Sequence, residues 1–503
     1  MGNSKKTGVS ILVIVFIILV AGYIATNYLS GRIQDELNSA LGEKSSHEKI
    51  DVDLFAQNIH LRSLKFRNRG TEINTPKLSF KGLSYLQYLK NGKIVFDEVS
   101  LAEPEIIIAP SQDSVSKSKV SFKKEIEVKV FKTSKATLEL KGKDSAGNKL
   151  FSRIREFEVS GIKVDSSTIN QMVPFNYNGY NFKVDSLRIN ITPEHYIASE
   201  SIDAKNGRVE VRNFKIIPNY GPSVFDQKIL YEKDRISLKV NQIRLDSLSF
   251  SFRNDTLYLQ NPVMGISGGD LQIYRNKTLP DNPKMIPLYS QMLRQSPVKL
   301  DLKEVSVDST RIVYEEKVKA DRQVARISFN NVDGKIDNLT NVGLDQKDLP
   351  RTKITASADF MDTTPVEIDW SFNAANQNEK FLFSGSFGRV SGDSMNAFLS
   401  PSMGLAAEGS INSVAFTFTG NDDMLSGDVQ VEYENFRIEI LKDQSRETSK
   451  FLSAIANLFV DNDGLSEENN IKDIQVNRDK AKSFWNYVWL GLKKGVLDAL
   501  VQI

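Results

Sequence analysis

Apolar and polar residues alternate with a period of two over most of residues 51–440, which is typical of β-strands with one buried face. Ile126-Glu127-Val128-Lys129-Val130 and Ile236-Ser237-Leu238-Lys239-Val240 are clear examples. Dipeptides typical of hairpin turns separate the apolar runs, namely Asn91-Gly92, Gly147-Asn148, Asn206-Gly207 and Asp333-Gly334. Helical periodicity is nearly absent apart from a short piece around Met285–Leu293. We therefore predict a mainly β protein, a long antiparallel β-meander with one apolar face.

The same arrangement of apolar positions recurs about every 62 residues, each time with an Asp-Ser pair in register. The pairs are Asp185-Ser186, Asp246-Ser247 and Asp308-Ser309, and steps of three residues recur beside them. Self-similarity at a fixed period predicts stacked units of about 60 residues. We interpret each Asp-Ser pair as a bulge or turn, because one carboxylate per unit is too sparse for a calcium site.

An apolar sheet face without covering helices can close on itself or curl into a groove, and we expect a groove. Its candidate lining residues are the repeated apolar positions. They are Phe182, Val184, Leu187, Ile189, Ile236, Leu238, Val240, Ile243, Leu245, Val298, Leu300, Leu302, Val305 and Val307.

The N-terminus carries one apolar span, Val9 to Leu29, with Lys5 and Lys6 before it. A helix of this length covers about 31 Å, the thickness of a bilayer core. The predicted anchor residues are Val9, Ile11, Leu12, Phe16, Leu19 and Leu29. The two lysines predict a single pass with the N-terminus in the cytoplasm and the bulk exported. A signal peptide cleaved after Gly22 is the alternative.

The periodicity becomes helical after Leu441, first around Phe451–Phe459 and again in the last segment, Asp479–Ile503. We therefore predict amphipathic helices at the C-terminus. Phe484, Trp485 and Trp489 in the last segment are candidate interfacial residues, with Lys493 and Lys494 nearby. This helix is expected either to cap an open β edge or to contact a membrane or a partner.

The amino-acid composition excludes several kinds of catalytic and metal-binding site. The chain has no cysteine, three histidines and a net charge of +2, so a thiol nucleophile and cysteine-ligated metals are excluded and nothing indicates nucleic acid. A G-x-S-x-G sequence occurs at 265–269, but no histidine follows it, and we interpret it as a Gly-rich hairpin turn. We predict no catalytic residue, no metal site, no cofactor and no enzymatic activity.

Two long segments resemble the AsmA family of inner-membrane-anchored periplasmic proteins. The first is Ile50 to Pro104, and the second is Met403 to Leu441, with Gly409, Gly420 and Gly427 expected at its turns. The resemblance implies a bridge-like lipid transfer protein that moves phospholipid between the inner and outer membranes and serves outer-membrane homeostasis. It implies phospholipid and the inner membrane as partners, with outer-membrane or envelope proteins at the C-terminus. The alternative is a non-catalytic structural or interaction protein of the envelope with a closed β-solenoid.

These observations predict five segments. They are a cytoplasmic tip and anchor (1–31), a groove entry module (32–170), the repeated groove units (171–345), an AsmA-like C-terminal β module (346–445) and a helical C-terminus (446–503).

Overall fold

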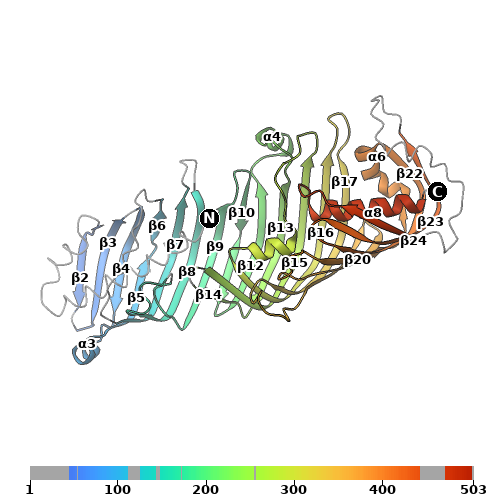
Figure 1. Cartoon of the computed structure of the whole chain (residues 1–503). Helices are drawn as coiled ribbons and strands as arrows, with labels where there is room; N and C mark the ends of the chain where they lie inside the picture. The colour runs from blue at the N-terminus through green and yellow to red at the C-terminus, as the bar shows by residue number, and fades with distance from the viewer. Residues whose placement is uncertain are drawn as a thin grey trace. The chain divides into compact units, whose positions relative to one another are not determined.

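A computed structural model describes residues 45–53, 55–68, 70–110, 125–142, 148–171, 173–253, 256–441 and 471–500. Over these residues the chain is mainly β, as predicted (Figure 1). The predicted anchor residues and the amphipathic segment Phe451–Phe459 lie outside the described residues. Within the described ranges, no helix is long and apolar enough to cross a membrane. The chain forms two compact units. Unit 1 holds the described residues up to Phe214 and Leu245–Leu257, and unit 2 holds Lys215–Arg244 and the residues from Tyr258 onward.

Unit 1 is built on one sheet in which most strands pair with the next along the chain. Its elements are β1 (Ser45–Ser46), β2 (Lys49–Asp53), β3 (Asn58–Asn68), β4 (Thr71–Lys81), α3 (Tyr85–Asn91), β5 (Ile94–Ala102), β6 (Glu105–Ile108), β7 (Ile126–Lys141), β8 (Asn148–Val164), β9 (Gly179–Asn190), β10 (His195–Ser199), β11 (Ser201–Lys205), most of β12 (Arg208–Pro218) and β14 (Ser249–Arg253). In addition, β1 pairs with β3, β5 with β7 and β11 with β9. A buried cluster that includes Leu61, Phe80, Phe96 and Val128 lies on one face of β3–β8.

Unit 2 is also built on one sheet, with helices packed on it. Its elements are α4 (Pro222–Lys228), most of β13 (Arg235–Asp246), β15 (Thr256–Asn276), α5 (Tyr289–Gln295), β16 (Lys299–Lys317), β17 (Ala325–Thr340), β18 (Thr352–Phe360), β19 (Thr364–Phe372), β20 (Phe381–Phe387), β21 (Val390–Ser391), α6 (Gly392–Met403), β22 (Leu405–Gly420), β23 (Met424–Ile440), β24 (Ile471–Asn477) and α8 (Phe484–Leu500). The helix α8 lies across β23 and β24 (Figure 1).

Among the strand pairs whose register the structure describes, the prediction of an antiparallel sheet is wrong at three. β5 and β6 each pair in parallel with β7, and β15 pairs in parallel with β16. Parallel neighbours need a crossover connection, and the connection between β15 and β16 contains α5. The short helical piece predicted around Met285–Leu293 therefore corresponds to part of a crossover.

Of the predicted hairpin turns, Asn206-Gly207 is confirmed, because it joins β11 to β12 with φ angles of 45° and 88°. Gly92 instead ends helix α3 in the left-handed conformation. Asp333-Gly334 lies inside β17, and the Gly-rich sequence 265–269 lies inside β15 rather than in a hairpin. Gly147 lies outside the described residues. A positive φ is needed equally at hairpins, helix ends and bulges, so these residues alone did not distinguish the three.

Two glycines of the C-terminal β module are also inside strands rather than at turns. A Cβ on Gly409 would lie 2.0 Å from the carbonyl oxygen of Asn435, and one on Gly427 would lie 1.9 Å from that of Thr417. Both positions therefore exclude any side chain. Gly420, in contrast, ends β22 next to the connection to β23, as predicted.

The Asp-Ser pairs of the repeat are bulges or turns, as predicted: two lie at bulges, and Ser247 lies in the connection between β13 and β14. Ser247 and Ser309 have positive φ angles of 63° and 52°, and the register between β16 and β17 shifts beside Ser309. The register between β8 and β9 shifts beside Asp185 in the same way. The Ser309 N–H donates to Asp333 Oδ1 at 2.8 Å, so a neighbouring strand satisfies the amide that the bulge displaces.

Candidate functional site

A continuous row of apolar residues crosses seven strands of unit 2. Residues paired directly across neighbouring strands project their side chains from the same face of a sheet. The row consists of Met264, Val305, Ile336, Ile354, Trp370, Phe383 and Phe418, on β15 to β20 and β22. A second row runs beside it through Ile266, Val307, Gly334, Ala356, Ile368, Gly385 and Phe416. This face carries apolar side chains from the repeated strands into the C-terminal module.

One end of this face is closed by α8. Phe484, Tyr487 and Val488 of the helix are buried in one cluster with Phe383 and Phe418 of the sheet. The ring of Phe484 stacks on that of Trp370 with 4.6 Å between centroids. The rows are therefore sealed from solvent where they cross the strands beneath this helix.

The other end of the same face is less completely buried. Met264, Ile336 and Ile354 are only half-buried, although they continue the row that is buried at Phe383 and Phe418. Of the fourteen predicted lining residues, eleven are half-buried and only Val184, Val240 and Val305 are buried. Among them, Leu300 pairs with a residue of β15, and Leu302 pairs with residues of both β15 and β17. Neither leucine is buried.

In unit 1, too, the apolar residues change from buried to half-buried along the sheet. A row through Ile59, Phe80, Val99, Phe131 and Val159 is buried in its core. Further along the sheet, apolar residues still pair across strands, but many are half-buried. They include Phe157 with Phe182, Ile154 with Val184 and Ile202, and Leu150 with Ile189 and Ile197. The predicted lining residues of β9 thus lie on a half-exposed apolar surface within unit 1.

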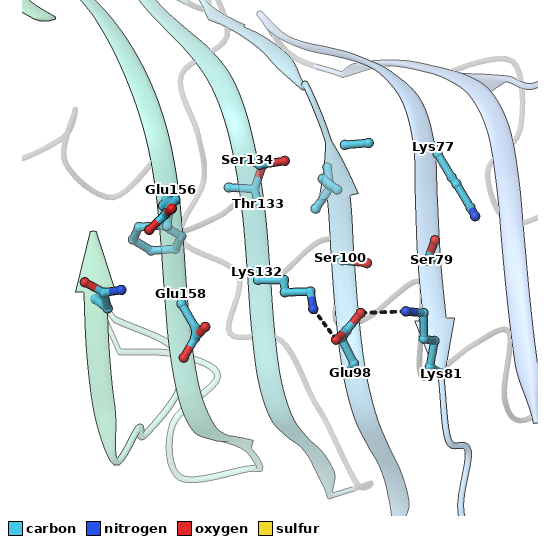
Figure 2. A pocket seen from close by; sticks show the side chains of 14 residues that line it. Lys77, Ser79, Lys81, Glu98, Ser100, Lys132, Thr133, Ser134, Glu156 and Glu158 are labelled. Atoms are coloured by element: carbon cyan, nitrogen blue, oxygen red, sulfur yellow. Dashed lines mark ion pairs between the residues drawn. The ribbon is translucent and has the colours of Figure 1, made fainter. Parts of the chain in front are cut away.

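The opposite face of unit 1's sheet carries a charged hollow (Figure 2). Glu98 lies there between Lys81, 3.0 Å from its Oε1, and Lys132, 2.5 Å from its Oε2. Burial alone would raise the pKa of the Glu98 carboxyl, but the hydrogen bonds from Lys132 and Lys81 outweigh it and lower that pKa. None of the fourteen predicted lining residues lines this hollow. Its ion pairs are typical of the solvated face of a sheet.

The three candidate interfacial residues take different positions on α8. Phe484 is buried, and Trp489 is half-buried with its ring 5.9 Å from that of Phe398. Trp485 is 53 % exposed and donates its Nε1–H to the hydroxyl of Tyr289 at 3.2 Å. The helix therefore covers the face of the sheet, and Trp485 is the most exposed of the three.

Sequence reasoning did not include the aromatic residues beneath α8 in the site. Trp370, Phe383 and Phe418 belong to the same row as Val305, and the alternation Phe381-Leu382-Phe383 was a signal that could have found them. In the described ranges, no group of three or more potential metal ligands gathers. The absence of catalytic residues stays a prediction.

Comparison with known proteins adds no relative: no protein-family model and no curated protein sequence matches the chain. The fold and the site define a β-sheet protein with apolar faces that are closed at one end and half-exposed along the repeated strands. The resemblance to the AsmA family rests on the two segments Ile50–Pro104 and Met403–Leu441. In the structure these correspond to β2–β5 with α3, and to β22 and β23.

Proposed function

We propose that the chain is a membrane-anchored envelope protein that binds phospholipid acyl chains on its half-exposed apolar strands and transfers phospholipid between the inner and outer membranes. The observation that supports this most is the half-burial of the repeated apolar residues. Eleven of the fourteen are half-buried, whereas Trp370, Phe383 and Phe418, which continue the row through Val305, are buried in the cluster that α8 covers.

Apolar surface left in water is unfavourable by about 25 cal/mol per Å². Soluble proteins therefore rarely keep contiguous apolar patches exposed unless the patches bind something. A row that runs across strands is a linear track, which suits a flexible hydrocarbon chain that makes no directional hydrogen bonds.

The dimensions fit an acyl chain. From β15 to β18 the unit 2 row crosses three steps between strands, which amounts to about 14 Å at about 4.8 Å each. The hydrocarbon of one leaflet is about 15 Å thick, half of a bilayer core of about 30 Å. The row from Met264 to Ile354 is thus about as long as the hydrocarbon of one leaflet is thick.

The proposed location follows from the sequence. The apolar span Val9–Leu29 anchors the chain in the inner membrane, and Lys5 and Lys6 hold the N-terminus in the cytoplasm. The bulk of the chain is then periplasmic, where the AsmA resemblance also places it. Its C-terminal end is the part available to outer-membrane or envelope proteins.

A structural or interaction protein of the envelope is the second candidate. The buried cores at β3–β8 and beneath α8 favour it, because closed cores need no lipid.

Arginine substitutions distinguish the two candidates. In a half-exposed face, Leu238→Arg and Leu300→Arg place a charge that can extend to solvent, so the protein folds while acyl chains are excluded. We expect normal yield and protease resistance, with several-fold less co-purifying phospholipid, for each variant and more so for the double variant.

The matched control is Phe418→Arg in the sealed part of the row, where Phe418 is 0 % exposed. A charge buried there destabilises the fold by several kcal/mol, so we expect loss of expression. Wild-type protein that folds but carries no phospholipid would overturn the lipid proposal. Collapse of the leucine variants would show a closed structural core.

A further inference from the structure

One end of unit 1 carries three strongly exposed large apolar side chains. Phe55 is 102 % exposed, Leu89 is 75 % exposed and Leu86 is 68 % exposed. Phe55 lies in the connection between β2 and β3, while Leu86 and Leu89 lie on α3. We call these three residues the apolar tip.

The backbone places the two parts of the apolar tip together. Ile59 at the start of β3 pairs with Phe80 near the end of β4, so the β2–β3 connection and α3 lie at the same end of these strands. The Leu83 N–H, just before α3, donates to the carbonyl oxygen of Gln57 at 3.3 Å. Figure 1 shows α3 projecting beyond the ends of β4 and β5.

The orientation of α3 is fixed by its other face. Tyr85 and Tyr88 pack against the buried core of unit 1, so Leu86 and Leu89 are directed away from it. The side chain of Ser84 caps the N-terminus of the helix, and Gly92 ends it in the left-handed conformation. The seven residues of α3 include no acidic residue, and the last turn carries Lys90. The helix is thus held in place by tyrosines with its leucines outward.

We infer that the apolar tip inserts into the interface of the lipid bilayer that holds the chain's own N-terminal span. Aliphatic and aromatic side chains outward, tyrosines behind them and a lysine at the rim are the composition of an element that lies in a membrane interface. This inference rests on the membrane anchoring that is part of the proposed function.

The length of chain between span and sheet allows this contact. Fifteen residues lie between Leu29 and Ser45, and the sixteen steps from one to the other span up to about 55 Å at 3.3–3.6 Å each. From Ser45 to the β2–β3 connection the chain advances nine or ten residues, about 30 Å as a strand. The tether is therefore longer than the distance that separates the start of the sheet from the apolar tip.

The lack of cysteine in the chain gives a direct test. Phe55→Cys, Leu86→Cys and Leu89→Cys are made singly in the full chain, labelled with a fluorescent NBD maleimide, and reconstituted into vesicles of phosphatidylethanolamine and phosphatidylglycerol. The matched control is Leu382→Cys on β20, an exposed apolar residue at 41 % exposure. We expect blue-shifted emission at the three tip positions, with at least about twofold quenching by lipids that carry a nitroxide near the headgroup, and neither change at the control.

The outcomes separate this inference from the proposed function. If the protein floats with the vesicles but the tip labels behave like the control, the tip inference is wrong and the anchoring stands. Blue-shifted labels that the nitroxide lipids do not quench would mean that protein covers the tip, which also overturns the inference. Protein that does not float with the vesicles would overturn both the anchoring and the inference.

Discussion

The serines of two Asp-Ser pairs adopt a backbone conformation that disfavours residues with a side chain. Ser247 and Ser309 adopt positive φ angles at equivalent positions of the repeat. A residue with a Cβ is disfavoured there by about 1 kcal/mol or more, whereas glycine is not. The bulge bends the strand locally and shifts its register by one residue. The three-residue step from Val307 to Thr310 therefore spans the bulge at Ser309, and Thr310 is buried after it.

Substitutions at Ser309 test this account. Ser309→Gly relieves the left-handed strain and is expected to stabilise unit 2 by up to about 1 kcal/mol, while Ser309→Val is expected to destabilise it by about 1–2 kcal/mol. Urea denaturation followed by circular dichroism measures both. Ser306→Gly on the same strand is the control, because Ser306 has no positive φ, and it is expected to lose about 0.5–1 kcal/mol. Equal losses for the two glycine variants would contradict the strain argument.

At the scale of elements, α8 approaches the sheet closely because it presents glycines to it. Gly491 and Gly495 are one helical turn apart and both face the strands β22 and β23. A Cβ on Gly495 would lie 2.3 Å from Val429 Cγ2 and 2.4 Å from its Cβ, whereas one on Gly491 would lie 3.0 Å from the end of the Leu425 side chain. Valine is stiff at χ1, so it cannot move aside as leucine can.

This difference in contacts predicts different effects on stability for alanine at Gly495 and at Gly491. Alanine raises helix propensity by about 1 kcal/mol at either glycine. At Gly495 the clash with Val429 outweighs that gain, and we expect Gly495→Ala to destabilise the protein by about 1–3 kcal/mol. Gly491→Ala is the matched control and is expected to be close to neutral. The melting temperatures of the two variants measure this difference in stability. A Gly495→Ala variant as stable as the wild type would show that α8 does not pack as described.

The elements that the sequence analysis predicted correctly are those with local causes. The strand at 235–246, the bend at Ser247 and the turn at Asn206-Gly207 each depend on residues within a few positions. The parallel pairing of β15 with β16 depends on a crossover, and no local signal at Lys299 or Tyr258 reveals it. The extent of burial was not predictable either. Phe383 under α8 and Leu300 without that cover have the same alternating neighbourhood, and only the distant helix distinguishes them.

At the scale of each unit, the closed end limits what a bound acyl chain can do. In unit 2 the apolar rows lead from half-exposed strands to the cluster beneath Phe484 and Tyr487. An acyl chain that follows these rows meets a packed core of the density of a protein interior. Under the proposed function, lipid must therefore leave the row before β19, where Trp370 stacks on Phe484, or α8 must move.

The position of the whole chain relative to the membrane gives the last prediction. Lys5 and Lys6 before a single apolar span predict a cytoplasmic N-terminus and export of everything after the span. Because the chain has no cysteine, Asn3→Cys and Leu382→Cys each supply one reporter thiol. In intact spheroplasts a membrane-impermeant maleimide is expected to label Leu382→Cys and not Asn3→Cys, and lysis is expected to expose both. Labelling of Asn3→Cys alone would reverse the topology. Labelling of neither before lysis would place the sheet in the cytoplasm and remove the basis for transfer between two membranes.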